Sequence, residues 1–259
     1  MKTKLRIIKI GGNVIDDSEN LDLFLANFAR LDGFNILVHG GGKLATKLSD
    51  KLGVDVQLID GRRITSSENL EVVTMVYAGL INKQICAKLQ GYGCNAIGLS
   101  GADANCITST KRPPTPINYG YVGDIKTVDT TAINNFLKED ITPVFCAITH
   151  DGNGQLLNTN ADTIAAEVAI AMSSDYETEL IYCFEKKGVL ANVEDDNSVI
   201  SSINMEKYEA LKAKGTINSG MLPKMENCFH ALKQNVSKVI IGSVGVIEET
   251  NDKHTTLTL

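Results

Sequence analysis

Short, mostly apolar runs alternate with amphipathic stretches along the chain. Residues 5–10 and 35–39 are runs of the kind found in strands buried on both faces of a sheet. Residues 19–31 instead place apolar side chains at helical spacing, as at Leu21 and Leu25. Strands that alternate with helices predict an α/β fold, a three-layer αβα sandwich around one mainly parallel central sheet.

The same pattern predicts the remaining elements. We expect strands at 95–99, 142–147, 180–184 and 238–241, and helices at 43–52, 65–90, 131–138, 163–173, 205–214 and 222–234. Thr65 and Glu68 have the spacing of a capping box that begins the long second helix. Asp60-Gly61 marks the turn of a short strand pair, and the polar, proline-containing run 100–123 predicts an exposed loop or hairpin tip.

Composition and charge exclude several classes of protein. Of the 259 residues 43% are hydrophobic and 22% charged, and the formal charge is −6, opposite to that of a broad nucleic-acid-binding face. No apolar run approaches the roughly 18 residues of a membrane span, so we expect a cytoplasmic protein without membrane contact. The six scattered cysteines and four histidines form no metal-ligand pattern, and we expect no metal held by side chains.

Glycine turns follow the first two predicted strands. Gly11-Gly12 follows the first, and Gly40-Gly41-Gly42 follows the second and precedes a helix. Backbone amides at such turns can approach an anion closely, which suits a phosphoryl group, although tight turns without a ligand have the same sequence. Leu44 after Gly42-Lys43 excludes the P-loop pattern, and the dinucleotide-binding fingerprint is also absent.

Three polar positions are candidates for chemistry. Lys9 interrupts an apolar strand, so its ammonium either reaches a ligand or extends to solvent from an exposed strand end. Asn158 and Asn160 either bind a small polar substrate beside Asp162, or Asn160 only caps the following helix. Lys224 lies at a predicted helix start and is equally compatible with a surface lysine.

Five motifs together resemble the N-acetyl-L-glutamate kinase family of the amino acid kinase superfamily. They are K-I-G-G at 9–12, V-H-G-G-G at 38–42, G-R-R-I-T at 61–65, L-N-T-N-A-D at 157–162 and G-M-L-P-K at 220–224. The resemblance implies transfer of the γ-phosphoryl of ATP to the side-chain carboxylate of N-acetyl-L-glutamate in arginine biosynthesis. It also implies an N-terminal lobe (1–175) for acylglutamate binding and dimerisation and a C-terminal lobe (176–259) for ATP.

The resemblance also implies roles for individual residues. The catalytic and nucleotide-binding set comprises Lys9, Lys224 and Asp162 with the backbone amides of Gly12, Gly41 and Gly42. The substrate-binding set comprises Arg63, Asn158 and Asn160 with Gly41 and Gly42. Mg²⁺ would be held mainly by the phosphates of ATP.

Two departures from the family pattern leave alternatives open. Phe184-Glu185-Lys186-Lys187 stands where the family has Thr/Ser-Asp, so only the Gly188 turn is carried over as a nucleotide contact. This departure favours a non-catalytic nucleotide-binding regulatory subunit as an alternative. Carbamate kinase and glutamate 5-kinase are further alternatives, which Arg63 and the N-x-N-A-D motif disfavour. No helix is predicted ahead of the first strand, and we therefore expect a homodimer that arginine does not regulate.

A third departure concerns the acyl group. The family commonly has an apolar residue before the matched arginine, near the acyl group, but this chain has Arg62. A guanidinium suits an acyl chain that ends in a carboxylate, so N-succinyl-L-glutamate is an alternative substrate. Consecutive residues of an extended segment point to opposite faces, however, which would leave Arg62 in solvent.

Overall fold

The computed structural model describes residues 2–59, 61–217, 221–248 and 253–259. The central sheet contains β1 (Lys4–Ile10), β2 (Phe34–His39), β5 (Ala96–Leu99), β8 (Thr142–Cys146), β11 (Glu177–Cys183), β12 (Ser202–Ile203), β13 (Lys238–Gly242) and β14 (Thr255–Leu257). Its strand order is β12-β14-β13-β11-β1-β2-β8-β5. Every pair is parallel except β13–β14.

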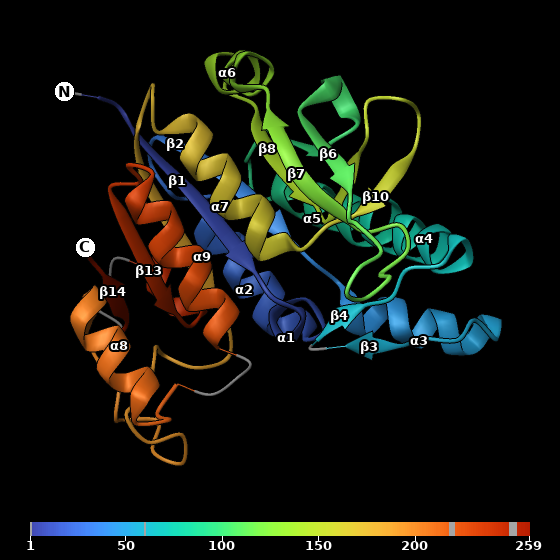
Figure 1. The fold of residues 1–259 in the computed structure, drawn as a ribbon. Coiled ribbons are helices and arrows are strands. Elements are labelled where there is room, and N and C mark those ends of the chain that lie inside the picture. The colour runs from blue at the N-terminus through green and yellow to red at the C-terminus, as the bar shows by residue number, and fades with distance from the viewer. Residues whose placement is uncertain (1, 60, 218–220, 249–252) are drawn as a thin grey trace.

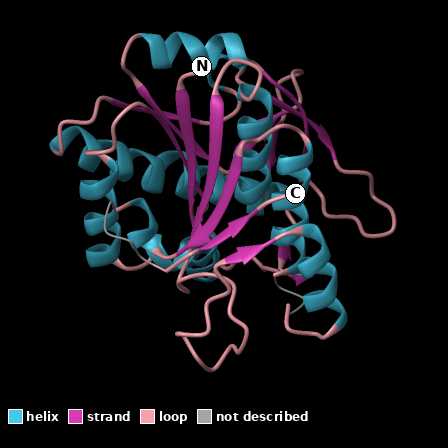
Figure 2. Ribbon diagram, turned by 90° about the vertical axis from the view of Figure 1, so that its left-hand side faces the viewer, coloured by secondary structure: helices cyan, strands magenta, loops and turns pink. Residues whose placement is uncertain are grey.

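Helices cover both faces of this sheet (Figures 1 and 2). They are α1 (Gly12–Ile15), α2 (Ser18–Phe28), α3 (Gly42–Leu52), α4 (Ser67–Thr74), α5 (Asn82–Gly91), α6 (Thr130–Lys138), α7 (Ala161–Met172), α8 (Met205–Ala213) and α9 (Leu222–Lys233). A π-helical segment, η1 (Met75–Ile81), joins α4 to α5, and two 3₁₀ turns are η2 (Asp103–Asn105) and η3 (Val244–Ile247). The predicted three-layer α/β fold is confirmed.

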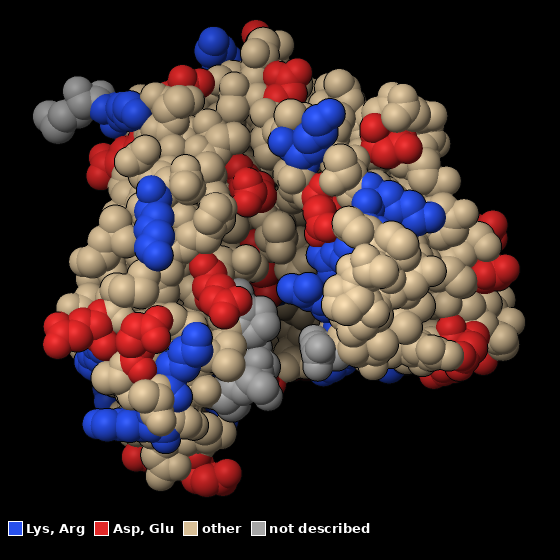
Figure 3. Space-filling view, in the orientation of Figure 1, with Lys and Arg blue, Asp and Glu red and all other residues tan. Residues whose placement is uncertain are grey.

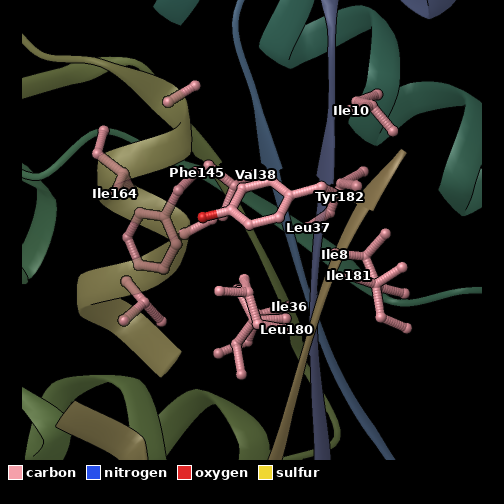
Figure 4. Packing of buried hydrophobic residues seen from close by; sticks show 14 of the residues in the cluster. Ile8, Ile10, Ile36, Leu37, Val38, Phe145, Ile164, Leu180, Ile181 and Tyr182 are labelled. Atoms are coloured by element: carbon pink, nitrogen blue, oxygen red, sulfur yellow. The ribbon is translucent and has the colours of Figure 1, made fainter. Parts of the chain in front are cut away.

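Strand register explains which side chains face α7. Lys9 of β1 lies in register with Val38 of β2 and with Tyr182 of β11, so the three side chains share one face of the sheet. Figure 4 shows Val38 and Tyr182 on the side of Ile164, which belongs to α7. Lys9 therefore lies on a buried face, at the carboxyl end of its strand, and not on an exposed strand end.

The expected mainly parallel central sheet is confirmed, but the described residues form two smaller sheets as well. A separate four-stranded sheet, in the order β10-β9-β6-β7, contains β6 (Ile107–Lys111), β7 (Gly123–Val128), β9 (Ile148–His150) and β10 (Leu156–Asn158). A two-stranded sheet pairs β3 (Leu58–Ile59) with β4 (Arg62–Arg63). The prolines of the run 100–123 lie in the tip of the β6–β7 hairpin, which agrees with the hairpin tip that the sequence predicted. The strand β6 itself was missed because it is rich in Thr and Ser and exposes part of one face, which weakens the apolar signal of a strand.

The long helix begins one residue later than predicted. Ser66, and not Thr65, is the N-cap of α4: its Oγ accepts a hydrogen bond from the backbone N–H of Asn69. Thr65 is fully buried, and its hydroxyl donates to the backbone carbonyl of Arg63. The structure thus uses Thr65 to hold the segment between β4 and α4.

Most of the cysteines are packed inside the protein. All six are free thiols, and Cys106, Cys146, Cys183 and Cys228 are buried. Burial raises the pKa of the Cys146 thiol to about 12, so this group stays protonated and packs as a small apolar side chain. Among the described residues no helix is long and apolar enough to cross a membrane.

Candidate active site

A cavity of about 630 Å³ opens at the carboxyl ends of β1 and β2. Both glycine turns, the first turns of α3 and α7 and the β3–β4 hairpin line it. In Figure 3 a hollow lies near the centre of the molecule, with Lys and Arg side chains along its rim. Ligands bind at this edge of open α/β sheets, so the cavity is where the predicted site residues are expected to meet.

One buried carboxylate joins two ammonium groups beside this cavity. Asp162 Oδ1 lies 2.6 Å from Lys9 Nζ, and Asp162 Oδ2 lies 3.0 Å from Lys224 Nζ. Lys9 and Asp162 are only 8% and 9% exposed. Burial opposes the charge of the Asp162 carboxylate, but Lys9 and then Lys224 outweigh that effect and lower its pKa well below the usual range. Asp162 is therefore ionised at every physiological pH.

Three elements bring these groups together. Lys9 is the penultimate residue of β1, while Asp162 and Lys224 lie in the first turns of α7 and α9. Helices α7 and α9 pack against each other (Figure 1). The Tyr182 hydroxyl on β11 donates to the backbone carbonyl of Asp162 at 3.0 Å, which fixes the start of α7 against the sheet. Gly220 of the G-M-L-P-K motif lies outside the described residues.

The second glycine turn is shaped by the helix behind it. Gly41 has a φ of +155°, and a Cβ there would lie 2.2 Å from Ile81 Cδ1 and 3.1 Å from the ring of Tyr77. Only glycine therefore fits between the turn and η1. Gly42 follows as the first residue of α3, and Gly12 in the other turn begins α1. Gly12, Gly41 and Gly42 all line the same cavity, so both turns border it.

A buried histidine makes a hydrogen bond to the same turn. His39 Nδ1 lies 2.8 Å from the carbonyl oxygen of Gly40, and Nε2 lies 3.1 Å from Nδ2 of Asn82. These partners select the neutral ring with the proton on Nδ1, since the Asn82 amide nitrogen can only donate. Burial is the largest cause that lowers the pKa of His39, to about 4.

The predicted substrate-binding residues line the other walls of the cavity. Arg63 Nη2 donates to the Gly42 carbonyl at 3.1 Å and to Thr46 Oγ1 at 2.7 Å. Arg63 Nη1 is buried and has no hydrogen-bond partner within the described part of the chain. Asn158 Nδ2 donates to Thr65 Oγ1 at 3.0 Å. The guanidinium of Arg63 is thus positioned by neutral acceptors and keeps its charge without a carboxylate partner.

Asn160 has the capping role that the sequence left open. Its Oδ1 accepts the backbone N–H of Thr163 at 3.0 Å and caps α7. The residue also lines the cavity, so capping does not remove it from the site. Its amide nitrogen donates no hydrogen bond to any described residue and stays available to a ligand.

Arg62 and Arg63 differ as neighbours in an extended segment should. Arg63 is buried and Arg62 is exposed, yet both line the cavity. Sequence reasoning missed Lys47, Tyr77 and Arg112, which also line it. For Lys47 a signal was present, because it lies four residues after Lys43 and hence on the same face of the helix that follows the glycine turn.

Gly188 is the one predicted site residue that lies apart. It lines neither this cavity nor the narrow space between Lys9, Lys224 and Phe184. A Cβ at Gly188 would approach Thr255 Oγ1 to 2.7 Å, so close packing against β14 explains the glycine. Packing against β14 therefore accounts for the glycine by itself, and the nucleotide contact of Gly188 stays a prediction.

The donor set of the cavity does not form a metal site of its own. Among the described residues no group of three or more His, Cys, Asp or Glu side chains could hold a metal ion. Asp162 is the sole carboxylate of the described residues that line the cavity, and two lysines engage it. A divalent cation fits here only when an anionic ligand brings most of its own oxygen ligands.

Comparisons with known proteins show the family of the chain. Residues 4–243 match the family model described as the amino acid kinase family. The acetylglutamate kinase of Cytophaga hutchinsonii is 54% identical over 97% of this chain and 96% of that protein, and that of Bacteroides fragilis is 50% identical over 93% and 92%.

Solved structures share the fold. The protein smu.665 of Streptococcus mutans superposes with a TM-score of 0.77 at 26% identity and covers 98% of both chains. Giardia carbamate kinase superposes with a TM-score of 0.71 at 14% identity, again over 98% of both chains, and shows the fold alone. On the family match and the close relatives, the chain belongs to the amino acid kinase family and, within it, to the acetylglutamate kinases.

Proposed function

We propose that this chain transfers the γ-phosphoryl group of ATP to the side-chain carboxylate of N-acetyl-L-glutamate, as a step of arginine biosynthesis. The products are N-acetyl-L-glutamyl 5-phosphate and ADP. The name shared by relatives about 50% identical over nearly the whole chain supports this reaction. The observation that carries the proposal is the Asp162 carboxylate, which holds the ammonium groups of Lys9 and Lys224 at one edge of the cavity.

The reaction joins two anions and needs no base. A carboxylate oxygen of the substrate forms a bond to the γ-phosphorus, while the bond between that phosphorus and the β–γ bridging oxygen breaks. The electron pair leaves with ADP, and no proton moves at the nucleophile. Catalysis of such a transfer rests on positioning and on stabilisation of the charge that spreads over the phosphoryl oxygens.

The two lysines supply that stabilisation in our proposal. Lys9 on β1 lies against the phosphoryl group on the side of the attacking carboxylate, and Lys224 on α9 neutralises charge on the leaving β-phosphate. Asp162 contacts both ammonium groups and fixes their positions. It acts as a positioning residue, because its lowered pKa makes it a poor proton acceptor.

The glycine turns and the substrate-binding wall complete the proposed site. Backbone amides of Gly12, Gly41 and Gly42 hold the phosphoryl oxygens, as an oxyanion hole does. Arg63 binds the substrate α-carboxylate, and its unpartnered charge in the buried wall supports that role. Asn158 and Asn160 contact the N-acyl amide.

Mg²⁺ accompanies ATP in this proposal. The ion neutralises the phosphates when it is bound, and phosphate oxygens supply most of its ligands. The cavity fits an ion held in this way, because its carboxylate, Asp162, is already in contact with Lys9 and Lys224 and offers no further protein ligand.

The proposal also covers the lobes, the oligomeric state and regulation. Residues 1–175 form the acylglutamate lobe, and residues 176–259 form the ATP lobe. Two copies of the chain associate as a homodimer, and arginine does not inhibit it. Met75 and Leu80 of η1 support the association, because they are about half exposed (52% and 48%) although large and apolar. Sedimentation equilibrium measures the association, and an assay at millimolar arginine measures the inhibition.

A hydroxamate assay tests the activity. Purified protein, ATP, Mg²⁺ and N-acetyl-L-glutamate are incubated with hydroxylamine, which traps an acyl phosphate as a coloured hydroxamate. The proposal expects product that depends on both ATP and the acylglutamate. Absence of product at high enzyme concentration, together with retained ATP binding, would instead support the regulatory-subunit alternative.

A further inference from the structure

One tyrosine lies where the second glycine turn meets the substrate-binding wall. Tyr77 belongs to the π-helical segment η1, is only 6% exposed and lines the cavity. Short π-helical segments inside helices are rare and occur frequently at functional sites. The phenol hydroxyl can donate one hydrogen bond and accept others, so it adds a polar group to this wall.

The ring and the hydroxyl of Tyr77 have different neighbours. A Cβ on Gly41 would lie 3.1 and 3.2 Å from the ring carbons Cδ1 and Cε1. A Cβ on Gly42 would instead lie 3.8 Å from the hydroxyl oxygen. The ring therefore packs against Gly41, and the hydroxyl lies beside Gly42.

Arg63 approaches the same glycine. Its Nη2 donates to the Gly42 carbonyl at 3.1 Å. The guanidinium also acts on the phenol: burial is the largest cause and raises the pKa of Tyr77, while the charge of Arg63 lowers it by less. The hydroxyl therefore stays protonated at neutral pH, next to the cation that the proposed function assigns to the substrate α-carboxylate.

The hydrogen of this hydroxyl has no acceptor among the described residues. Arg63 is the cation that acts on Tyr77, and a guanidinium donates hydrogen bonds but accepts none. Nη1 of Arg63 is likewise a buried donor without a partner in the described ranges. Two buried donors side by side favour a ligand oxygen that carries negative charge.

We propose that the Tyr77 hydroxyl donates a hydrogen bond to the substrate α-carboxylate beside Arg63, and is thus a further substrate-binding residue. A carboxylate has two oxygens and about four lone-pair sites, so it can accept from both side chains at once. Hydrogen bonds to a charged acceptor are about twice as strong as those between neutral groups. The proposal rests on the proposed kinase function, which places an α-carboxylate at Arg63.

The phosphates of ATP are the other anions near Gly42. In the proposed function they lie at the glycine-turn amides and between Lys9 and Lys224. Arg63, and neither of these two lysines, is the cation among the described residues that acts on the pKa of Tyr77. The hydroxyl is therefore placed by the subsite of the α-carboxylate, and the KM for ATP distinguishes the two anions.

Tyr77→Phe in the full-length enzyme tests the contact, because phenylalanine keeps the ring against Gly41 and removes the hydroxyl alone. A contact with the non-reacting carboxylate acts equally on the bound substrate and the transition state. KM for N-acetyl-L-glutamate should therefore rise about tenfold or more, while kcat and the KM for ATP stay within about threefold. A fall in kcat, a rise of the KM for ATP, or an unchanged KM for the acylglutamate would overturn the proposal.

A compound without the α-carboxylate locates the contact. The compound 4-acetamidobutanoate keeps the acetamide and the side-chain carboxylate of N-acetyl-L-glutamate and has a hydrogen atom in place of the α-carboxylate. Its inhibition constant against N-acetyl-L-glutamate is measurable whether or not it is phosphorylated. Tyr77→Phe should change this constant by less than about threefold, since the acceptor of the hydroxyl is absent. Equal losses for the two compounds would contradict the proposal.

Tyr208 on α8 provides the matched control. It is 4% exposed, its hydroxyl has no hydrogen-bond partner among the described residues, and it does not line the cavity. Tyr208→Phe should leave kcat and both KM values within about threefold. A rise of the KM for N-acetyl-L-glutamate in this variant as well would mean that loss of any buried hydroxyl has the effect, and would overturn the proposal.

A binding measurement separates the contact from the kinase function. Titration calorimetry with N-acetyl-L-glutamate alone should give a Kd about tenfold higher or more for Tyr77→Phe than for the unmodified protein. If the compound is not phosphorylated but this difference is present, the kinase function fails and the contact stands. If the two Kd values are equal, the contact is wrong whatever the activity.

Discussion

The two ends of the cavity are built in opposite ways. At the carboxyl end of β1, Lys9 and Asp162 are less than a tenth exposed and are in direct contact. At the β3–β4 hairpin, Arg62 is exposed and unpaired within the described part of the chain. At the β1 end the charged side chains are fixed by one another before a ligand binds. At the hairpin end the charge of Arg62 is left for a ligand to neutralise.

This difference separates catalysis from recognition. Groups that stabilise a transition state work best when their positions are fixed in advance, because no reorganisation is then needed during the reaction. Groups that select a substrate can stay solvated until the counter-charge of the ligand displaces water. An exposed arginine without a partner costs the folded protein little stability while no ligand is bound. Substitutions at the buried end should therefore affect kcat and stability together, and a substitution of the exposed Arg62 should leave stability unchanged.

Asp162→Asn should have the largest effect. The amide leaves Lys9 and Lys224 without their shared counter-charge, so we expect kcat to fall by about a thousandfold and the free energy of unfolding by about 3 kcal/mol. Steady-state kinetics and urea denaturation measure the two effects. Asp22→Asn is the control, because it removes the exposed ion pair with Lys88 and should leave kcat unchanged and the stability within about 1 kcal/mol.

The buried His39 should make stability depend on pH. Its pKa is about 4 in the folded protein against 6.5 when unperturbed, so the unfolded chain binds the extra proton between these values. The free energy of unfolding should therefore fall by about 3 kcal/mol from this group as the pH drops from 6.5 to 4. Urea denaturation across that range measures the slope. His39→Gln, which keeps an acceptor for Asn82, should flatten it, and an unchanged slope would contradict the assignment.

Gly41→Ala tests how tightly the second glycine turn is packed. The new Cβ would meet Ile81 and Tyr77, whereas a Cβ at Gly53, also at positive φ, meets nothing within 4 Å. We expect Gly41→Ala to lower the free energy of unfolding by about 2 kcal/mol more than Gly53→Ala, which loses only the backbone preference of about 1 kcal/mol. If thermal denaturation shows the same loss of stability for Gly41→Ala and Gly53→Ala, η1 moves away from the new side chain and the packing is not tight.

Asn160→Asp should have the smallest effect on stability. Aspartate keeps the cap of α7 but removes the amide donor of a residue that lines the cavity. The free energy of unfolding should stay within about 0.5 kcal/mol while KM for the acylglutamate rises several-fold. Asn204→Asp, at the corresponding cap of α8, should change neither quantity. An unchanged KM in Asn160→Asp would mean that Asn160 only caps α7 and does not contact the substrate.

The sequence predicted the buried end of the cavity better than the open end. A lysine in an apolar strand and an acidic residue at a helix start are strong signals, because burial permits them only in contact with a partner. Lys9 and Asp162 accordingly meet where the resemblance placed them. The open end also includes Arg112, which directly follows β6. The polar side chains of β6 and β7 resemble those of a loop, so Arg112 was missed together with these strands.

The sequence did not predict some details of the helix ends and helix type, because tertiary contacts override local preference there. Thr65 and Ser66 both suit an N-cap, and the sequence alone does not show that Thr65 is needed between β4 and α4. The π-helical segment around Tyr77 likewise gives no periodic signal that differs from an α-helix. Gly188 shows that a glycine within a motif can also have a packing reason, since a Cβ there would meet Thr255.

The kinetics of Lys9→Met test the central claim most directly. If the buried ammonium acts on the transferring phosphoryl group, kcat should fall by at least about a hundredfold while KM for the acylglutamate stays within about threefold, since methionine keeps most of the length of the side chain and removes its charge. A kcat within about threefold of the unmodified enzyme would contradict the account.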